Sequence, residues 1–457
     1  MFRNRARHER TDAHALALDC LAAGIDAARP DRLVADAVSV SDDTLVVGDE
    51  HIDLSRVDRW FVIGGGKAAG ELAHSLTTRL GDRIDSGLVV GPTAGTAGPI
   101  ELLAGDHPVP TDRTVEATRR VCELAGNATG DDLVIVCVTG GASAMLCAPA
   151  DDLSVADLRE TTRLLLESGA SIEEINAVRK HCSAVKGGRL ARTLAPATVL
   201  TLAISDVVGD DPAVIGSGPT VPDPTTYADA RAVLARYDLL EAVPSPVRDH
   251  LARGAAGDPD VPETPTADEP AFQTSSWHLL AGGETAVRAA RRVADDRGYE
   301  SIVLSRSVVG EAETVGWVHA AIADEIRTAG EPVAPPAVVL SAGEVTVTVR
   351  GDGTGGPNQE LALAGAVELA DREVRAVLAS VDTDGVDGPT DWAGALVDET
   401  TVEGLVDETT VEIVAGRARA ALAHNDAGTV LDDAGATLET GSTGTNVNDL
   451  RVLVLSE

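Results

Sequence analysis

Short apolar runs alternate with helix-like segments throughout the first half of the chain, and this alternation constrains the fold most strongly. Runs rich in Val, Ile and Leu predict strands over Trp60–Ile63, Gly87–Val90, Leu133–Val138 and Thr198–Ile204. Apolar residues repeated at helical spacing predict helices over Ala13–Ala28, Ala68–Leu80, Thr114–Ala125, Val155–Ser168 and Gly187–Thr193. Strands that alternate with helices in this way form a mostly parallel, Rossmann-like sheet flanked by helices.

The second half of the chain repeats the α/β pattern. Its predicted strands are Trp277–Leu280, Ser301–Leu304, Val338–Ser341, Val345–Val349, Val374–Ser380 and Arg451–Leu455, and its predicted helices are Glu284–Arg297 and Glu311–Thr328. The strands on either side of Ala342–Glu344 stand close enough to form a hairpin. A segment rich in proline and acidic residues separates the halves. We therefore expect an N-terminal domain over 1–254, a linker over 255–270 and a smaller α/β domain over 271–457.

A short tandem duplication interrupts the second half. Val397–Glu403 is repeated as Val406–Glu412. The period is too short for a repeat architecture, so we expect an extended loop or the start of a helix.

The charge balance of the chain is strongly acidic. Of 457 residues, 73 are Asp or Glu and 37 are Lys or Arg, which gives a net charge of −36. A general nucleic-acid binder would carry a basic stripe, so this class is excluded. Only three of the basic residues are lysines, and aromatic residues make up 2% of the chain. Such a composition is typical of proteins adapted to high salt, whose dense anionic surface keeps them solvated.

Cysteine use and hydropathy indicate a soluble cytoplasmic protein. The five cysteines include no Cys-x-x-Cys pair, which favours a reducing compartment and no structural zinc. The basic start of the chain lacks the apolar core of a signal peptide, and no segment approaches a membrane span. We expect small-molecule substrates and no membrane or nucleic-acid partner, and the sequence leaves homo-oligomerisation open.

The first candidate binding loop is Gly64-Gly65-Gly66-Lys67, between a predicted strand and a predicted helix. Glycines let the backbone approach a phosphate, and a helix N-terminus offers N–H groups and a partial positive charge. A chain that has almost dispensed with lysine retains it where a compact ammonium is needed. The loop also satisfies the Gly-x-Gly-x-x-Ala pattern, but no acidic residue ends the next predicted strand to hold a ribose, which argues against NAD.

A second loop of the same kind, Thr139–Ser143, follows the next buried strand. The amides of Gly140 and Gly141 and the hydroxyl of Ser143 are suited to wrap an anion. Basic residues follow at Arg179–Lys180 and at Lys186–Arg189, which is unusual in so acidic a chain. Two such loops in one domain favour a phosphate site over two tight turns.

Two carboxylates, Asp206 and Asp210, directly follow the predicted strand that ends at Ile204. The carboxyl ends of strands are where α/β sheets place ligands. Paired aspartates there suit Mg²⁺ held together with substrate phosphates and water.

A further acidic loop lies in the second half, where Asp382, Asp384 and Asp387 partly imitate a calcium loop. The twelfth position, which should be a bidentate Glu, is Ala393. An active-site loop is therefore a better interpretation than an EF-hand.

Several motifs occur in one order along nearly the whole chain. They are Gly64–Ala69, Gly105–Pro110, Gly140–Ala144, Ile175–His181, Lys186–Leu190, Ser205–Asp210, Gly216–Thr220, Asp384–Thr390 and Gly444–Asp449. With them the chain resembles the glycerate 2-kinase family, in which a Rossmann-like N-terminal domain is joined to a smaller, leucine-rich MOFRL domain.

The resemblance implies ATP-dependent phosphorylation of D-glycerate at its 2-hydroxyl, with Mg²⁺ as cofactor, and it makes Lys67 a catalytic lysine. Phosphoryl transfer needs positioned reactants and neutralised charge, so we expect Lys67 and Lys186 to face the transferring group. Asp206 and Asp210 are the expected metal ligands. The candidate substrate-binding residues are Arg179, Lys180, Arg189, Asp384 and Asn358. Asp206, Asp210 and Asp384 all remain candidates for the general base.

One position departs from the family pattern. Where the family commonly has Gly-Gly-Arg-Asn-x-Glu, this chain has Pro357 in place of the arginine, followed by Asn358-Gln359-Glu360. Proline carries no charge and donates no hydrogen bond. Either another cation such as Arg179 or Arg189 takes its role, or the chain belongs to a subgroup that handles the carboxylate differently.

Two other functions stay open. An NAD-dependent hydroxypyruvate reductase would use the Gly64 loop for pyrophosphate, but the missing ribose acid and the lack of a convincing His–acid pair argue against it. A non-catalytic nucleotide or sugar-phosphate sensor would not need the carboxylate clusters of both halves.

Overall fold

The computed structural model describes residues 1–41, 43–402 and 411–456, and they form two compact units. The first unit consists of Met1–Arg29 together with Ala281–Glu457, and the second consists of Pro30–Leu280. The chain therefore begins in one unit, builds the other and returns. Among the described residues, no helix is long and apolar enough to cross a membrane.

This division differs from the expected boundaries at 254 and 271. The expected linker over 255–270 is part of the second unit, because its polar groups are bound there. Arg192 donates hydrogen bonds to the carbonyl of Glu263 at 3.0 Å and to the Glu269 carboxylate, and the Asp223 amide donates to the carbonyl of Pro265 at 3.0 Å. The proline-rich, acidic segment therefore packs against the second unit, to which it contributes hydrogen-bond acceptors, and does not form a flexible linker.

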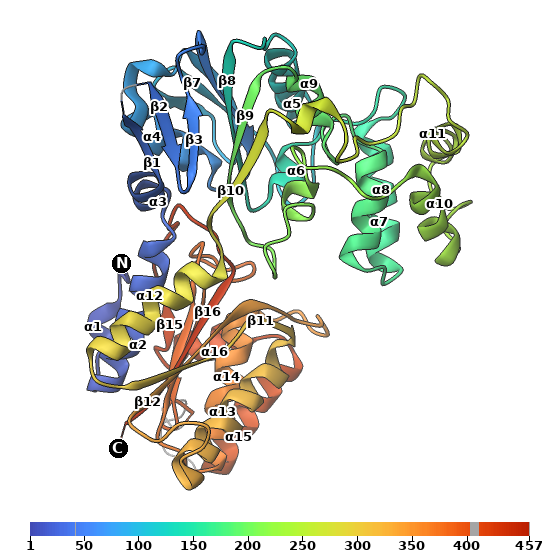
Figure 1. Cartoon of the computed structure of the whole chain (residues 1–457). Helices are drawn as coiled ribbons and strands as arrows, with labels where there is room; N and C mark the ends of the chain where they lie inside the picture. Colours follow the sequence, from blue (N-terminus) through green and yellow to red (C-terminus); the bar gives the residue numbers. More distant parts are fainter. Residues whose placement is uncertain (42, 403–410, 457) are drawn as a thin grey trace. The chain divides into compact units, whose positions relative to one another are not determined.

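The second unit is built on a seven-stranded sheet (Figure 1). Its strands lie in the order β10 (Ser275–Ala281), β9 (Thr198–Ile204), β8 (Asp132–Thr139), β4 (Arg59–Gly65), β5 (Ser86–Gly91), β7 (Ile100–Ala104) and β6 (Gly95–Ala97). The strands from β9 to β7 are parallel, and β6 is antiparallel to β7. After β4 the chain proceeds outward through β5 and β7, then returns to place β8 on the other side of β4. The switch point between β4 and β8 is where sheets of this kind bind ligands, at the carboxyl ends of the strands.

Helices and a small sheet complete this unit. They are α3 (Pro30–Ala37), α4 (Ala69–Leu80), α5 (Asp112–Ala125), α6 (Ala142–Met145), α7 (Val155–Glu167), α8 (Ile172–His181), α9 (Arg189–Leu194), α10 (Tyr227–Arg236) and α11 (Ser245–Ala255), with an antiparallel sheet of β1 (Val38–Ser41), β2 (Thr44–Val47) and β3 (Glu50–Asp53). Helices α7, α8, α10 and α11 lie beside the end of the sheet formed by β9 and β10 (Figure 1) and share their own apolar cluster around Tyr227.

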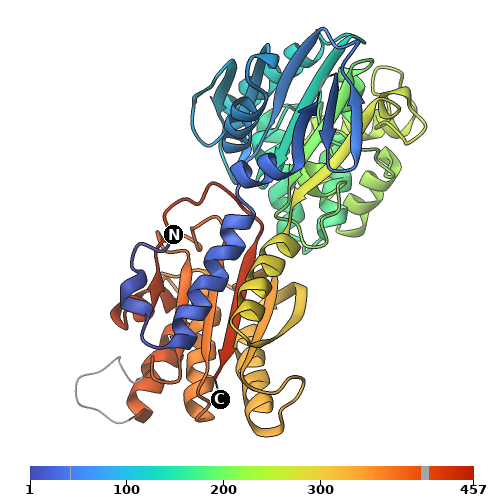
Figure 2. The same ribbon diagram turned by 60° about the vertical axis from the view of Figure 1, so that its left-hand side comes forward.

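The first unit is built on a six-stranded mixed sheet. Its order is β11 (Glu300–Glu311), β12 (Ala337–Thr346), β16 (Asp449–Leu455), β13 (Val377–Asp382), β14 (Gly394–Asp398) and β15 (Thr437–Leu438). Helices α2 (Asp12–Ala27) and α12 (Gly283–Asp296) lie side by side on one face (Figure 2), and α13 (Ala312–Ala329), α14 (Pro357–Asp371), α15 (Val411–Ala423) and α16 (Ala427–Asp433) lie on the other. A short helix, α1 (Arg5–His8), precedes α2.

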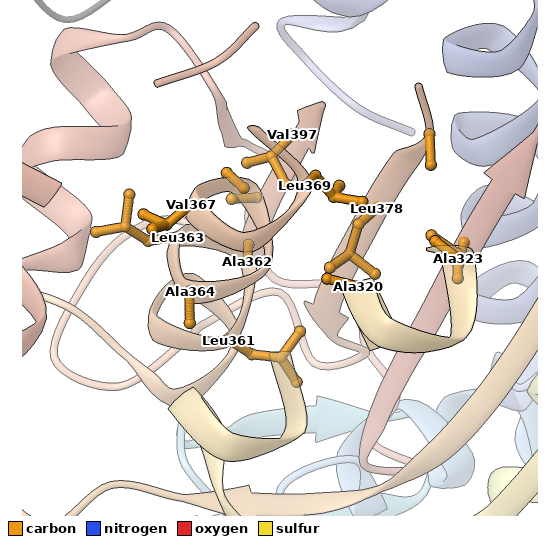
Figure 3. Packing of buried hydrophobic residues seen from close by; sticks show 14 of the residues in the cluster. Ala320, Ala323, Leu361, Ala362, Leu363, Ala364, Val367, Leu369, Leu378 and Val397 are labelled. Atoms are coloured by element: carbon orange, nitrogen blue, oxygen red, sulfur yellow. The ribbon is translucent and has the colours of Figure 1, made fainter. Parts of the chain in front are cut away.

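The core of the first unit lies between its sheet and α13 and α14. Ala320 and Ala323 of α13 and the apolar residues of α14 from Leu361 to Leu369 pack in one cluster with Leu378 and Val397 of the sheet (Figure 3). Helix α14 is buried on nearly every side, and it carries apolar residues all round instead of on one stripe. Because α14 is enclosed in this way, the residues at its N-terminus are held rigidly.

Most predicted elements are confirmed, and those of the first half match within two residues at each end. The predicted hairpin is wrong, because β12 runs through Gly343 without a turn. Gly343 has a φ of +133°, and a side chain there would lie 2.2 Å from the Val308 carbonyl of β11, so the glycine permits close approach of two strands. The predicted strand Trp277–Leu280 exists, but it belongs to the sheet of the second unit. The prediction for the duplication falls partly on 403–410, outside the described residues; Val397–Asp398 end β14 and Val411–Glu412 begin α15.

Candidate active site

The Gly64–Lys67 segment lies at the carboxyl end of β4, but its glycines face protein. A side chain on Gly64 would lie 2.0 Å from the Cys137 carbonyl, and one on Gly66 would lie 2.2 Å from the Thr139 hydroxyl, at φ angles of +140° and +135°. A side chain on Gly65 would meet Leu146 at 2.8 Å. The three glycines therefore allow β4 and the segment after it to pack closely against β8 and α6.

The main-chain amides of this loop are also occupied. The amide of Gly66 donates to Val90, that of Lys67 donates to Gly140 at 2.7 Å, and that of Ala68 donates to the Thr139 hydroxyl at 3.1 Å. The predicted amide cradle for phosphate is thus not available at these positions. The side chain of Lys67 extends past Gly141, whose ideal Cβ position lies 3.2 Å from Cγ of the lysine.

The Thr139–Ser143 loop, after β8, gathers chemically active side chains. Gly140 lies against the Asp206 carboxylate, since a side chain on this glycine would meet Oδ2 at 2.2 Å. Gly141, with a φ of +78°, lies against both His107 and Lys67, at 3.0 Å and 3.2 Å from its ideal Cβ position. The loop therefore brings Lys67, Asp206 and His107 to one end of the sheet.

His107 was not predicted as a site residue. It belongs to the segment after β7, and the sequence places it in a motif without indicating a role. Because β7 is two strands away from β4 in the sheet, only the strand order could have placed it beside Lys67.

Ser143 and the buried Lys186 form a second group. The Ser143 hydroxyl lies 3.1 Å from that of Ser217, which donates to Asn176 at 3.2 Å. The Lys186 ammonium donates to the carbonyls of Ser143 at 2.7 Å and Leu146 at 3.2 Å. Burial, with a contribution from the positive charge of Arg179, lowers the pKa of Lys186 from 10.5 to about 8. Lys186 thus fixes the α6 turn and keeps a titratable amine near neutral pH.

A pocket of about 470 Å³ adjoins this group. The segment His107–Pro110, the α6 turn and helices α7 and α8 line it, and Gly141, which touches Lys67, forms part of its wall. Its lining among the described residues includes the cations Arg159, Arg163, Arg179 and Lys186, together with His107, and no carboxylate. In a chain with a net charge of −36, such a lining favours an anionic ligand.

The predicted substrate-binding cations have different surroundings. Arg179 lines the pocket, and its guanidinium has no hydrogen bond or ion pair with any other residue that the structure describes. Lys180 points elsewhere and pairs with the buried Asp223 at 3.2 Å. Arg189 donates to the Tyr227 hydroxyl at 3.0 Å and to the Pro262 carbonyl at 3.1 Å. Of the three, the structure brings only Arg179 to the pocket.

The predicted metal ligands lie just beyond β9. Asp206 stands beside Gly140, and Asp210 occupies the turn that follows, with a φ of +54°. Within the described part of the chain, no three His, Cys, Asp or Glu side chains gather tightly enough to hold a metal alone. Mg²⁺ in nucleotide sites is usually bound through one or two carboxylates plus phosphates, so a carboxylate such as Asp206 suits it.

The remaining predicted residues, Asp384 and Asn358, lie in the first unit. Asp384 forms part of a turn after β13, where its carboxylate accepts from the amide of Val386 at 2.9 Å. Asn358 is buried at the start of α14 and donates to Asp449 at 2.7 Å and to Asp387 at 3.3 Å. Its side chain is therefore committed to the interior of this unit.

A buried polar cluster surrounds Asn358, and the sequence did not indicate it. Asp387 accepts from the amides of Asn358 at 3.0 Å and Gln359 at 2.8 Å, so its carboxylate caps α14 from the loop after β13. Asp449 pairs with Arg451, which is fully buried. Burial outweighs these hydrogen bonds and raises the pKa of Asp387 from 3.8 to about 7. The motif residues around Pro357 are thus held by a network of buried charges.

Pro357 is the first residue of α14, with Gly356 as its N-cap. Proline is favoured at this position, because the first helical N–H has no partner within the helix. The residue that departs from the family pattern therefore suits the backbone at the place where it stands.

Together these features define a class of protein: a two-unit α/β protein whose doubly wound sheet carries a pocket lined by cations. Comparison with known protein families agrees with an organisation in two α/β parts. Residues 16–252 match the family described as "Domain of unknown function (DUF4147)", and residues 337–449 match the MOFRL family. The chain is 38% identical to the glycerate 2-kinase of Pyrococcus horikoshii, over 97% of this chain and 98% of that protein. It is 37% identical to the D-glycerate 2-kinase of Thermotoga maritima, over 95% and 96%. The chain belongs to the glycerate 2-kinase family.

Solved structures and other relatives extend the comparison. The crystal structure of glycerate kinase from Thermotoga maritima matches with a TM-score of 0.82 and 35% identity, over 96% of this chain and 99% of that one. A relative from Agrobacterium vitis, 39% identical over 93% of each protein, carries a provisional name as a hydroxypyruvate reductase. The fold prediction, α/β with two domains, is confirmed.

Proposed function

We propose that this protein is an ATP-dependent D-glycerate 2-kinase, which transfers the γ-phosphoryl group of ATP to the 2-hydroxyl of D-glycerate. The names of the relatives from Pyrococcus horikoshii and Thermotoga maritima support the reaction. The observation that carries the proposal is the convergence of Lys67, His107 and Asp206 on the Gly140–Gly141 loop, beside a pocket lined by cations.

In this mechanism the protein positions the reactants and neutralises the charge that spreads over the transferring phosphoryl oxygens. Lys67 is our choice for that neutralisation, because its stem lies against Gly141, which forms part of the pocket wall. Arg179, which lacks a protein partner among the described residues, binds an anionic group of a substrate. Lys186 holds the α6 turn and adds positive charge to the pocket wall.

The carboxylates after β9 act on D-glycerate, the phosphoryl acceptor. Asp206 is our candidate for the general base that takes the proton of the 2-hydroxyl, because its carboxylate lies against the loop that also touches Lys67. Asp206 and Asp210 are also the residues that would hold Mg²⁺, which when bound neutralises phosphate charge.

A direct assay tests the proposal. Purified protein is incubated with D-glycerate, ATP and Mg²⁺ at high salt, and phosphorus NMR identifies the phosphorylated product. The expected product is 2-phosphoglycerate, which enolase consumes without the help of a mutase. Parallel incubation with NADH and hydroxypyruvate should give no oxidation of NADH. Oxidation of NADH without formation of a phosphoglycerate would overturn the proposal in favour of a reductase.

We also propose that the enzyme works in the cytoplasm of a cell with high internal salt. The five cysteines are free thiols, which suits a reducing compartment. With a net charge of −36, the acidic side chains repel one another at low ionic strength, and salt screens this repulsion. Activity and melting temperature should therefore both rise with KCl concentration; a protein that is most stable without salt would contradict this.

A further inference from the structure

The pocket between the His107–Pro110 segment and helices α6, α7 and α8 is larger and less polar than a three-carbon acid requires. Its volume of about 470 Å³ lies within the range of roughly 300–1,000 Å³ that is usual for sites of drug-sized ligands. Glycerate would leave most of this space unfilled. The pocket therefore calls for a larger ligand that has both an anionic part and an apolar part.

The walls of the pocket are of two kinds. Gly141, Ser143 and Lys186 form the wall that adjoins Lys67. The other wall is apolar. It is formed by Leu158 and Leu166 of α7 and by Pro108 and Val109 of the segment after β7. Val109 and Leu166 are 55% and 60% exposed, so large apolar side chains stand open to solvent at this pocket. Apolar side chains that are left uncovered at a concave site favour a flat, weakly polar ligand group.

One polar group of the α7 wall points to a specific partner. The hydroxyl of Thr161 is buried, with the residue only 3% exposed, and it has no hydrogen-bond partner within the described structure. Threonine in a helix usually bonds to the carbonyl of the preceding turn, but Thr161 does not. A buried hydroxyl that lacks a partner is unfavourable, and a ligand that supplies a donor or acceptor at this point relieves the cost.

We propose that this pocket binds the nucleoside part of the phosphoryl donor, with the base between the α7 residues and the His107–Pro110 segment and with the phosphates toward Arg179, Lys186 and Lys67. A purine has two flat apolar faces and a polar edge, which match the leucine walls and the Thr161 hydroxyl. This inference rests on the proposed kinase function, and it adds the part of the substrate that the pocket takes.

Two substitutions test the proposal. Leu158→Trp fills the apolar part of the pocket, and Thr161→Val removes the hydroxyl while keeping the shape of the side chain. Ala156→Trp, on an exposed position of the same helix that does not line the pocket, is the matched control. For each variant, ADP binding is measured by calorimetry and the Michaelis constants for ATP and D-glycerate are measured separately.

Leu158→Trp should weaken ADP binding and raise the Michaelis constant for ATP by about tenfold or more, with that for glycerate within about twofold. Thr161→Val should weaken ADP binding by roughly three- to tenfold and leave inhibition by inorganic tripolyphosphate unchanged. Because the variant removes an unsatisfied buried hydroxyl, its melting temperature without ligand should be equal to or above that of the wild type. Weaker ADP binding together with an unchanged or higher melting temperature distinguishes a ligand contact of Thr161 from a structural role. The Thr161→Val variant therefore tests the proposal even if Leu158→Trp fails to fold.

A rise in the Michaelis constant for glycerate with unchanged ATP and ADP parameters would overturn the proposal and assign the pocket to the acceptor. Unchanged constants for both substrates would also overturn it. A wild-type protein that binds ADP but phosphorylates no glycerate would contradict the proposed function, and loss of that ADP binding in Leu158→Trp would still support the pocket assignment.

Discussion

The main-chain N–H of Lys67 donates a hydrogen bond of 2.7 Å to the carbonyl of Gly140, and this bond joins the two loops at the switch point of the sheet. The Cβ position of Gly141, one residue further on, lies 3.2 Å from Cγ of the same lysine. Lys67 is therefore held at its backbone and along its stem by the loop after β8. A lysine fixed in this way directs its ammonium with little loss of entropy on binding.

Lys67→Ala should lower turnover by about 10² or more, equivalent to roughly 3 kcal/mol of lost charge stabilisation in the transition state. Lys67→Arg should also fail, because a planar guanidinium cannot replace a point charge at the same place. Steady-state kinetics with both substrates saturating measures the effect. Near-normal turnover in the alanine variant would contradict the assignment, and an unchanged melting temperature serves as the control for folding.

Gly66→Ala should destabilise the protein severely. The added methyl would lie 2.2 Å from the Thr139 hydroxyl at a φ of +135°, so β4 and β8 would have to separate. We expect a loss of about 3 kcal/mol or more in the free energy of unfolding, measured by denaturant titration. Gly70→Ala, four residues later in α4, meets its nearest neighbour at 3.6 Å and should be neutral or stabilising. Equal stability of the two variants would show that the glycine is not required for packing.

These glycines illustrate what can be predicted from the sequence. A strand followed by Gly-Gly-Gly-Lys and a helix is visible in the pattern of residues, because strand and helix periods are local properties. The pattern cannot tell whether a glycine admits a phosphate or a neighbouring strand, since that depends on β8, which is distant in the chain. His107, the pocket and the cap formed by Asp387 depend on strand order in the same way.

The domain boundaries could not be predicted for a related reason. The amphipathic pattern of α2 predicts a helix over Ala13–Ala28 correctly, but it carries no information about which sheet the helix covers. In the structure this helix packs beside α12, far along the chain. The prolines and acidic residues after α11 predict a linker, whereas in the structure Arg192 binds the Glu269 carboxylate and the main-chain carbonyl of Glu263.

The second-order rate constant kcat/KM should fall as the pH rises through about 8. Burial lowers the pKa of Lys186 from 10.5 to about 8, so its positive charge is lost from the free enzyme in this range. The lowered pKa of Lys186 also affects stability. Between pH 8 and 10.5 the unfolded chain binds more protons than the folded one, so the contribution of Lys186 to the free energy of unfolding should increase over that interval. Lys186→Met should remove the alkaline limb from the pH profile; an unchanged limb would assign it to another group.

Asp387→Asn should change the pH dependence of stability. The pKa of Asp387 is raised from 3.8 to about 7, so the folded state binds the proton more tightly and stability falls as the pH rises through this range. The variant should lose this slope. At pH 4.5 it should be less stable by about 1–3 kcal/mol, because the two carboxyl oxygens each accept from one amide, of Asn358 or Gln359, and the N–H₂ of asparagine opposes one of these two donors. Urea titrations at pH 4.5 and 7.5 measure both effects, with the exposed Asp391→Asn as a control of equal charge; a slope that persists in Asp387→Asn would contradict the assignment.

The last prediction concerns the position where the family commonly has arginine. Arg179 lines the pocket without a hydrogen bond or ion pair among the described residues, whereas Arg189 is bound to Tyr227 and Pro262. We therefore expect Arg179, and not Arg189, to supply the missing positive charge. Arg179→Ala should raise the Michaelis constant for ATP, whose phosphates we place toward Arg179, by about tenfold or more, corresponding to a lost charged hydrogen bond of roughly 1.5–3 kcal/mol. Arg189→Ala should leave that constant unchanged and lower the melting temperature.

Pro357→Arg should be neutral or harmful, since it adds a second cation and removes the residue favoured at the first position of α14. A Pro357→Arg variant with a lowered Michaelis constant for glycerate, together with an Arg179→Ala variant that binds both substrates normally, would show that the lost arginine has no replacement.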